Sequence, residues 1–263
     1  MKSVLIFVLA VLAGVADAQT TRRTFRQREI GFFGGASYYL GDINPRRHFR
    51  ANHPAVGVYY RYTTNYRYAF RFGLNYGKVS GSDAASGEAD QIERGASFQS
   101  PVYEGHALAE FNFVEYRIGH ERHRFTMFVF AGLGANYTSP VSDIGRGFQE
   151  GQGIMVESDR RTYSKYQVCV PFGLGLKFNI GDKCGLGIEW GPRKLFTDYL
   201  DDVSGTYNEA AVSLHPGTGE TVSYSKAAGN MRGNPTTRDW YFFYGVTLTF
   251  KLRDSKRPCH AYM

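Results

Sequence analysis

Residues 66 to 77 alternate between two kinds of side chain without a break. One parity is aromatic or aliphatic, and the other is small, polar or cationic: Tyr66, Tyr68, Phe70, Phe72, Leu74 and Tyr76 against Arg67, Ala69, Arg71, Gly73, Asn75 and Gly77. A β-strand sends successive side chains to opposite faces, so this segment has one apolar face and one small or charged face. The pattern predicts a strand that separates two different environments.

The alternation recurs along the chain. It predicts eight strands, over residues 29–39, 54–62, 66–78, 103–116, 124–136, 165–178, 184–193 and 239–252. Each is long enough for a tilted strand to cross the hydrocarbon layer of a membrane, which takes roughly 9–11 residues. In the last strand, for example, Trp240, Phe242 and Tyr244 are expected to face lipid.

The predicted connections alternate in length. Short ones lie at 63–65, 117–123 and 179–183, and long ones at 40–53, 79–102, 137–164 and 194–238. Short periplasmic turns and long external loops are typical of transmembrane β-barrels. The sequence therefore predicts an all-β fold: an eight-stranded antiparallel barrel of outer-membrane type over residues 19–252, with both termini in the periplasm.

Residues 1–18 have the features of a secretory signal peptide. Lys2 supplies the positive start, residues 4–15 the apolar run, and Ala16-Asp17-Ala18 the small-x-small cleavage site. The apolar run is too short to span a bilayer as a permanent helix. We therefore predict an exported protein of a Gram-negative outer membrane, with a basic periplasmic tail over residues 253–263.

The formal net charge of +7 constrains the partners. Nucleic-acid-binding proteins are also basic, but they gather their charge in a patch or along a helix. Here the Arg and Lys residues lie on alternate strand positions and at the two ends of the chain. Together with export, this excludes nucleic acid and favours outer-membrane lipid, in particular anionic lipopolysaccharide, or an acidic partner.

Charged residues also fall on the predicted lumen face. An eight-stranded barrel leaves an interior that side chains just fill. The charges expected there are Arg61, Arg67, Arg71, Glu104, Glu110, Lys177, Glu189 and Lys251. Because charges removed from water must be paired, we expect a network of ion pairs and tyrosines inside a plugged barrel, and not a diffusion pore.

Several stretches carry a resemblance beyond the barrel pattern. They are residues 29–31 running into 34–45 (GGASYYLGDINP), 71–78 (RFGLNYGK), 171–177 (PFGLGLK), 189–207 (EWGPRKLFTDYLDDVSGTY), 232–235 (RGNP) and 239–246 (DWYFFYGV). Together they resemble the PorG-type outer-membrane barrel family of Bacteroidetes, over nearly the whole mature chain. The resemblance implies a structural and assembly component of the type IX protein secretion system. Such a component anchors a periplasmic ring built from the lipoprotein PorK and its partner PorN.

Three cysteines lie in this exported chain. Cys169 is expected in the lumen, Cys184 near the periplasmic end of the seventh strand, and Cys259 in the tail. An odd count in an oxidising compartment leaves at least one thiol without an internal partner. The candidate contacts with a ring subunit are Cys259, through an intermolecular disulfide, and the tail cations Arg253, Lys256 and Arg257. The alternatives are a free thiol at Cys259 or a bond between Cys259 and Cys184.

Other clusters are better explained structurally. The carboxylates Asp198, Asp201 and Asp202 could attract Ca²⁺, but their spacing is not that of a recognised calcium loop. We expect them to cap a turn or to pair with Arg193 and Lys194.

A lumen pair between His106 and Glu110 is the expected arrangement for those two residues. Without a motif for a nucleophile, metal or cofactor, we predict neither catalysis nor a cofactor. The rival functions are a stand-alone small barrel for adhesion or envelope stability, and an outer-membrane enzyme.

Overall fold

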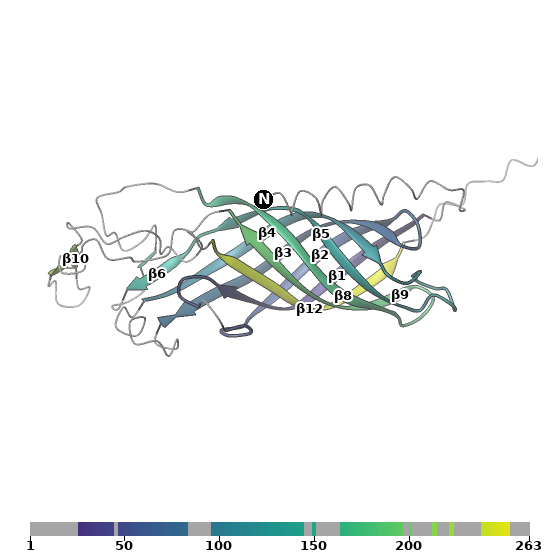
Figure 1. The fold of residues 1–263 in the computed structure, drawn as a ribbon, viewed down its shortest axis with the longest axis horizontal. Helices are drawn as coiled ribbons and strands as arrows, with labels where there is room; N and C mark the ends of the chain where they lie inside the picture. Colours follow the sequence, from purple (N-terminus) through teal and green to yellow (C-terminus); the bar gives the residue numbers. More distant parts are fainter. Residues whose placement is uncertain are drawn as a thin grey trace, which may run out of the picture.

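The barrel wall consists of eight long strands. The structure is a computed structural model, and it describes residues 26–44, 47–83, 96–144, 149–150, 164–196, 200, 212–214, 221–223 and 238–252. The strands are β1 (Gln27–Leu40), β2 (His53–Thr63), β3 (Tyr68–Ser82), β4 (Ala96–Asn112), β5 (Phe125–Thr138), β8 (Tyr166–Asn179), β9 (Cys184–Leu195) and β12 (Trp240–Lys251). Each is antiparallel to the next, and β12 returns to pair with β1 (Figure 1). The sheet is therefore closed, and the predicted fold class is confirmed.

The strand ends differ from the prediction at the external side. The β3–β4 pair continues to Ser82 opposite Ser97, although residues 79–102 were predicted as a loop. Beyond the membrane the outward side chains need not be apolar, so the alternation that marks a membrane strand fades while the backbone pairing continues. Two short strands, β6 (Val141–Ile144) and β7 (Gln149–Glu150), extend this sheet from β4.

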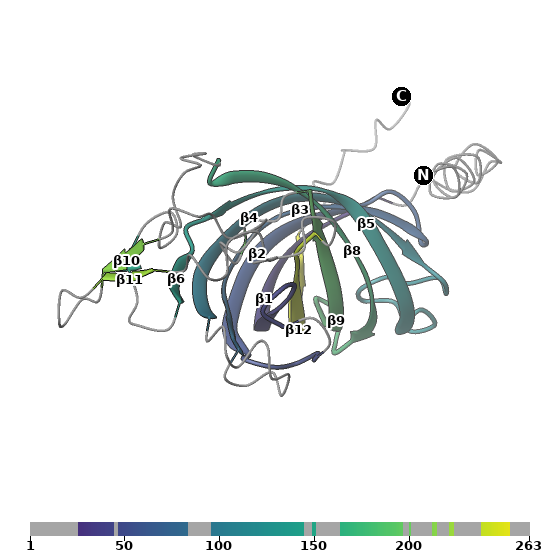
Figure 2. The ribbon, with the colours of Figure 1, turned by 60° about the vertical axis from the view of Figure 1, so that its left-hand side comes forward.

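Two further differences concern the predicted connections. A small separate hairpin, β10 (Val212–Leu214) with β11 (Thr221–Ser223), lies within the long 194–238 connection and stands apart from the wall in Figure 2. Residues 113–116, predicted as the end of a strand, belong to the turn between β4 and β5. In the described part of the chain, no helix is long and apolar enough to cross a membrane.

Apolar side chains cover the outside of the barrel. Phe72, Leu74, Leu133 and Val168 all point outward and are more than half exposed. An external row of tyrosines runs around the wall in the order Tyr76, Tyr103, Tyr137 and Tyr166, with neighbouring ring centroids 4.9, 6.2 and 5.1 Å apart.

A second aromatic row lies towards the periplasmic side, where Tyr68 and Phe111 are 5.2 Å apart and Phe125 and Phe178 are 5.0 Å apart. Along β3, Tyr68 and Tyr76 are separated by about 26 Å of strand, at roughly 3.3 Å per residue. An apolar band between two aromatic girdles is the exterior of an outer-membrane barrel, and this is where the protein resides.

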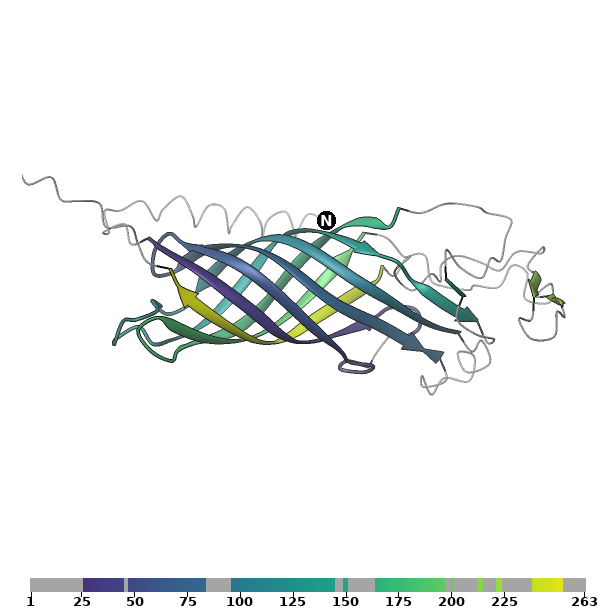
Figure 3. The same ribbon diagram turned by 180° about the vertical axis from the view of Figure 1, so that it is seen from behind.

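The seam between β1 and β12 closes the barrel (Figure 3). At its middle, Gly35 lies directly opposite Gly245. A Cβ atom on Gly35 would clash with the Tyr244 carbonyl oxygen, and one on Gly245 would clash with the Gly34 carbonyl oxygen. The two strands therefore approach closely only because neither residue carries a side chain.

Candidate functional site

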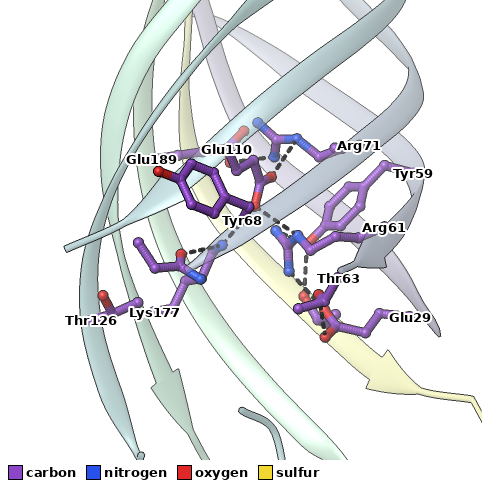
Figure 4. Close-up of polar contacts among 12 residues, drawn as sticks. Glu29, Tyr59, Arg61, Thr63, Tyr68, Arg71, Glu110, Thr126, Lys177 and Glu189 are labelled. Atoms are coloured by element: carbon purple, nitrogen blue, oxygen red, sulfur yellow. Dashed lines mark hydrogen bonds and ion pairs between the residues drawn. The ribbon is translucent and has the colours of Figure 1, made fainter. Parts of the chain in front are cut away.

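Glu110 of β4 is the centre of the charge network inside the barrel (Figure 4). Its side chain is fully buried and receives three cations: Arg61 Nε at 2.9 Å, Arg71 Nε at 3.0 Å and Lys177 Nζ at 2.6 Å. These cations come from β2, β3 and β8, so the Glu110 carboxylate links three other strands of the barrel wall to β4. A buried carboxylate requires such compensation, because an unpaired buried charge is costly.

Two further carboxylates balance the arginines. Arg61 Nη1 also lies 3.0 Å from Glu29 Oε2 on β1, and Arg71 Nη1 lies 2.6 Å from Glu189 Oε2 on β9. Lys177 Nζ donates in addition to Asn112 Oδ1 at 3.0 Å. Three cations thus meet three carboxylates, and the pairs join β1, β2, β3, β4, β8 and β9 across the lumen.

Aromatic rings lie beside the cations of the network. The guanidinium carbons of Arg61 and Arg71 lie 4.9 and 5.1 Å from the centre of the Tyr59 ring. The Lys177 ammonium lies 4.2 Å from the centre of the Phe128 ring. Cations are attracted to aromatic faces, so Tyr59 and Phe128 favour this arrangement while filling the space that water would need.

A second polar centre surrounds Glu104 on the external side of the network. Its carboxylate accepts from Arg193 Nε at 3.1 Å, the Tyr241 hydroxyl at 2.7 Å and Asn75 Nδ2 at 3.2 Å, and lies 2.9 Å from His106 Nδ1. All five side chains are at least nine-tenths buried. Glu104 therefore plays the same part for β3, β9 and β12 that Glu110 plays for β2, β3 and β8.

An apolar cluster, which we call the external lid, fills the lumen towards its external end. It includes Tyr39, Phe98 and Phe243 from the wall, Ile43 from the β1–β2 connection and Leu200 from beyond β9. Asp239 holds the lid in place: it accepts from the Tyr39 hydroxyl and from the Leu200 backbone amide, both at 3.0 Å. The external mouth is therefore closed by a packed core.

The turn between β4 and β5 closes the periplasmic mouth. Tyr116 and Ile118 are both buried there, and the Tyr116 hydroxyl donates to the Phe178 carbonyl at 3.4 Å. Burial raises the pKa of Tyr116, so this hydroxyl keeps its proton. Together with the external lid and the ion pairs, this turn gives the barrel buried side chains at both mouths and in the middle of the lumen, which agrees with the prediction of a plugged barrel.

Most of the predicted lumen charges meet, and two do not join the network. Arg61, Arg71, Glu104, Glu110, Lys177 and Glu189 lie inside as expected. Arg67 is exposed in the β2–β3 turn, where it donates to the Phe113 carbonyl at 3.1 Å. The alternation continues through the turn in sequence, but β3 begins only at Tyr68. Lys251 is half-buried opposite Glu29 at the last pair of the β1–β12 seam.

The prediction missed Glu29 and Arg193 as lumen residues. Arg193 has the lumen parity of Glu189, so the alternation of β9 could have identified it; it was instead expected to pair with the aspartates of the following loop. His106 pairs with Glu104 and not with Glu110. Residues i and i+2 of a strand lie on the same face, so Glu104 is the nearest lumen-facing neighbour of His106 on β4. Glu110 is four residues away and is too distant to compete.

The remaining candidates are partly outside the described residues. Cys169 is buried in the lumen as predicted and Cys184 begins β9 at the periplasmic end; these two described cysteines are not bonded to each other. The calcium candidates Asp198, Asp201 and Asp202 lie outside the described residues, as do the signal peptide, the tail and its candidate contacts Arg253, Lys256, Arg257 and Cys259. Within the described ranges, no group of three or more His, Cys, Asp or Glu side chains could hold a metal ion.

Comparisons with known proteins identify the family of the chain. The family model for a domain of unknown function, DUF6089, matches residues 2–262. A search of the curated proteins finds no match.

Among solved structures, the chain is similar to Neisserial surface protein A (NspA), with 8% identity, a TM-score of 0.45 and coverage of 87% of this chain and 99% of that chain. It is also similar to a major outer membrane protein from Thermus thermophilus, with 9% identity, a TM-score of 0.42 and coverage of 86% and 99%. A third is Ail, the attachment invasion locus protein of Yersinia pestis, in complex with the heparin analogue sucrose octasulfate, with 12% identity, a TM-score of 0.40 and coverage of 86% and 99%.

Proposed function

The chain belongs to the DUF6089 family, and we propose that it is a closed, non-catalytic anchor in the outer membrane that holds a periplasmic ring of a type IX secretion system. The observation that carries this proposal is the filled lumen. Glu110 and Glu104 tie opposite walls together, and both mouths are occupied by side chains. A barrel without a free passage acts through its two ends and its lipid-facing wall.

The charge of the periplasmic end supports an anchoring role. Exposed cations gather on the turns and strand ends there: Arg26, Arg28, Arg67, Arg122, Arg124 and Lys183, against the exposed carboxylates Glu121 and Asp182. A positive surface complements an acidic partner and speeds the encounter with it. The resemblance to the PorG-type family supplies the candidate partners, PorK and PorN, and the tail with Cys259 would add to the same surface.

A pull-down with charge variants at opposite ends of the barrel tests the proposal. A tagged barrel is extracted from outer membranes in mild detergent and analysed on reducing and non-reducing gels. PorK and PorN should copurify with the wild-type chain and be lost from a variant with Arg122→Gln, Arg124→Gln and Lys183→Gln. The matched control, Arg47→Gln with Arg50→Gln at the external end, should retain both. Recovery of the barrel alone in several detergents would contradict the anchor.

The same gels test the thiol. A disulfide through Cys259 predicts a larger band that collapses only with reductant and disappears in Cys259→Ser. An unchanged band pattern in this variant would remove the disulfide from the proposal and leave the contact to charge.

A second candidate function is that of a stand-alone barrel in adhesion or envelope stability. The observation in its favour is the extension of β3 and β4 beyond the tyrosine row, continued by β6 and β7. This sheet projects on the external side and could contact a surface. Normal secretion after deletion of the chain, together with lost surface attachment, would favour it over the anchor.

A further inference from the structure

An aromatic cluster lies on the outside of the barrel, at the external ends of β1, β12 and β9. Its wall members are Tyr38, Phe242, Tyr244 and Trp190, which the strand register places on the face directed at lipid. Tyr38 and Phe242 stack with centroids 4.5 Å apart and planes 4° apart. The Trp190 indole donates to the Tyr38 hydroxyl at 3.0 Å. These rings are packed and hydrogen-bonded like a core although they stand outside the barrel.

The β1–β2 connection folds back over these rings. His48 Nδ1 lies 3.1 Å from the Tyr38 hydroxyl, and the Phe49 ring meets Tyr244 edge-on at 5.1 Å. We call the four wall rings together with His48 and Phe49 the aromatic clasp. It leaves Tyr38 0% and Phe242 4% exposed, whereas the sequence predicted Phe242 and Tyr244 in contact with lipid. That expectation is wrong for Phe242 because residues of a connection, and not lipid, cover it.

The backbone of the connection is constrained to hold this position. Phe49 and Ala51 have φ values of 57° and 50°, a left-handed conformation that costs energy for residues with a side chain. The Asn52 side-chain amide donates to the Phe49 carbonyl at 2.7 Å and fixes this turn. Phe49 is nevertheless 54% exposed. The turn therefore presents a large apolar ring on the outside of the barrel, at the external ends of β1, β12 and β9.

Cations flank the exposed ring. Arg47 is exposed and Arg50 is half-buried, on either side of His48 and Phe49. Amphipathic aromatic rings settle at the level of lipid headgroups, and basic side chains at that level attract anionic headgroups. Arginine in particular matches the geometry of phosphate through paired N–H donors. The short segment from Arg47 to Arg50 thus carries an exposed ring, which suits the acyl chains of a lipid, between two cations, which suit a phosphate.

We propose that the aromatic clasp is a binding site for an anionic lipid of the external leaflet that carries a phosphate monoester, as phosphatidic acid does and zwitterionic phosphatidylcholine does not. Arg47 and Arg50 contact the phosphate, and Phe49 lies against the first part of the acyl chains. The lipid-facing position of the wall rings selects a lipid as the occupant, because a soluble phosphate would gain nothing from the exposed ring. This site is independent of the periplasmic anchor and does not rest on it.

The test follows lipid binding at the clasp through Trp190. The full barrel carrying Trp240→Phe, in which Trp190 is the remaining tryptophan, is reconstituted in phosphatidylcholine nanodiscs containing increasing amounts of phosphatidic acid. Phosphatidic acid should shift the Trp190 emission and remain bound in native mass spectrometry. Arg47→Gln with Arg50→Gln should weaken binding about 30-fold, the effect of two basic residues near an anionic surface.

Two further variants localise the effect and separate it from misfolding. Phe49→Ala keeps both arginines and should reduce the Trp190 shift. Arg122→Gln with Arg124→Gln makes the same charge change on the periplasmic turn and should leave the shift unchanged. All variants are first checked for the heat-dependent gel migration of a folded barrel. An unaltered response in the Arg47/Arg50 variant, or equal binding of phosphatidylcholine, would overturn the proposal. Displacement of the lipid by inorganic phosphate alone would overturn the assignment to a lipid.

Discussion

Removal of the Glu110 charge is the sharpest test of the lumen network. The substitution Glu110→Gln keeps the shape of the side chain and withdraws one negative charge from three cations. Two of them keep a carboxylate: Arg61 still meets Glu29 at 3.0 Å, and Arg71 still meets Glu189 at 2.6 Å. Lys177 keeps only the neutral Asn112 amide oxygen among its described polar contacts. The cost of the substitution therefore falls on Lys177.

The expected loss follows from this imbalance. Breaking a buried ion pair by removing one partner costs about 3–5 kcal/mol, because the other charge stays buried without compensation. This is a large part of a folding free energy of about 5–15 kcal/mol. The double variant Glu110→Gln with Lys177→Met removes both members of the 2.6 Å pair. Its free energy of unfolding should return close to the wild-type value, since replacing a whole buried pair by uncharged groups is often neutral.

Reversible urea unfolding in phospholipid vesicles measures these differences. Tryptophan emission from Trp190 and Trp240 reports the transition, and heat-dependent gel migration reports the folded fraction. Glu121→Gln, on the exposed periplasmic turn, is the matched control and should change the free energy of unfolding by less than about 0.5 kcal/mol. The reasoning is refuted if Glu110→Gln costs no more than this control, or if adding Lys177→Met restores nothing.

Three other outcomes follow from the packing of the wall and lumen. Gly35→Ala should destabilise the barrel by about 1–3 kcal/mol or more, as overpacking does, because its Cβ would strike the β12 backbone; Gly34→Ala, with nothing within 4 Å of its Cβ, should be nearly neutral in the same urea assay. Leu133→Arg places a charge on the lipid face, where Leu133 is 65% exposed, and should lower the free energy of unfolding by about 2–4 kcal/mol near the bilayer midplane. If Leu133→Arg costs no more than the control Glu121→Gln, Leu133 does not contact lipid. The wild-type chain should carry no stable ion current in planar bilayers, and persistent current steps would contradict the closed lumen.

Much of this architecture could be predicted from the sequence because it depends on local geometry. The pleat of a strand fixes which residues share a face, so alternation alone separated Phe72 and Leu74 on the lipid side from Arg71 in the lumen. The same rule placed Glu110 and Lys177 inside. Where the prediction failed locally, as for Arg67, the alternation ran through a turn in which the strand geometry no longer holds.

Tertiary structure decided which buried charges meet and what covers the wall. Arg71 and Glu189 are 118 residues apart and join β3 to β9 across the lumen. Parity says that both point inward, but their distance depends on the stagger of all the strands between them. The aromatic clasp has the same origin: Phe242 has the pattern of a lipid-facing residue, and only the folded β1–β2 connection covers it. Alternation is a property of one strand, whereas pairing and coverage arise between segments whose relative position is fixed only when the barrel closes.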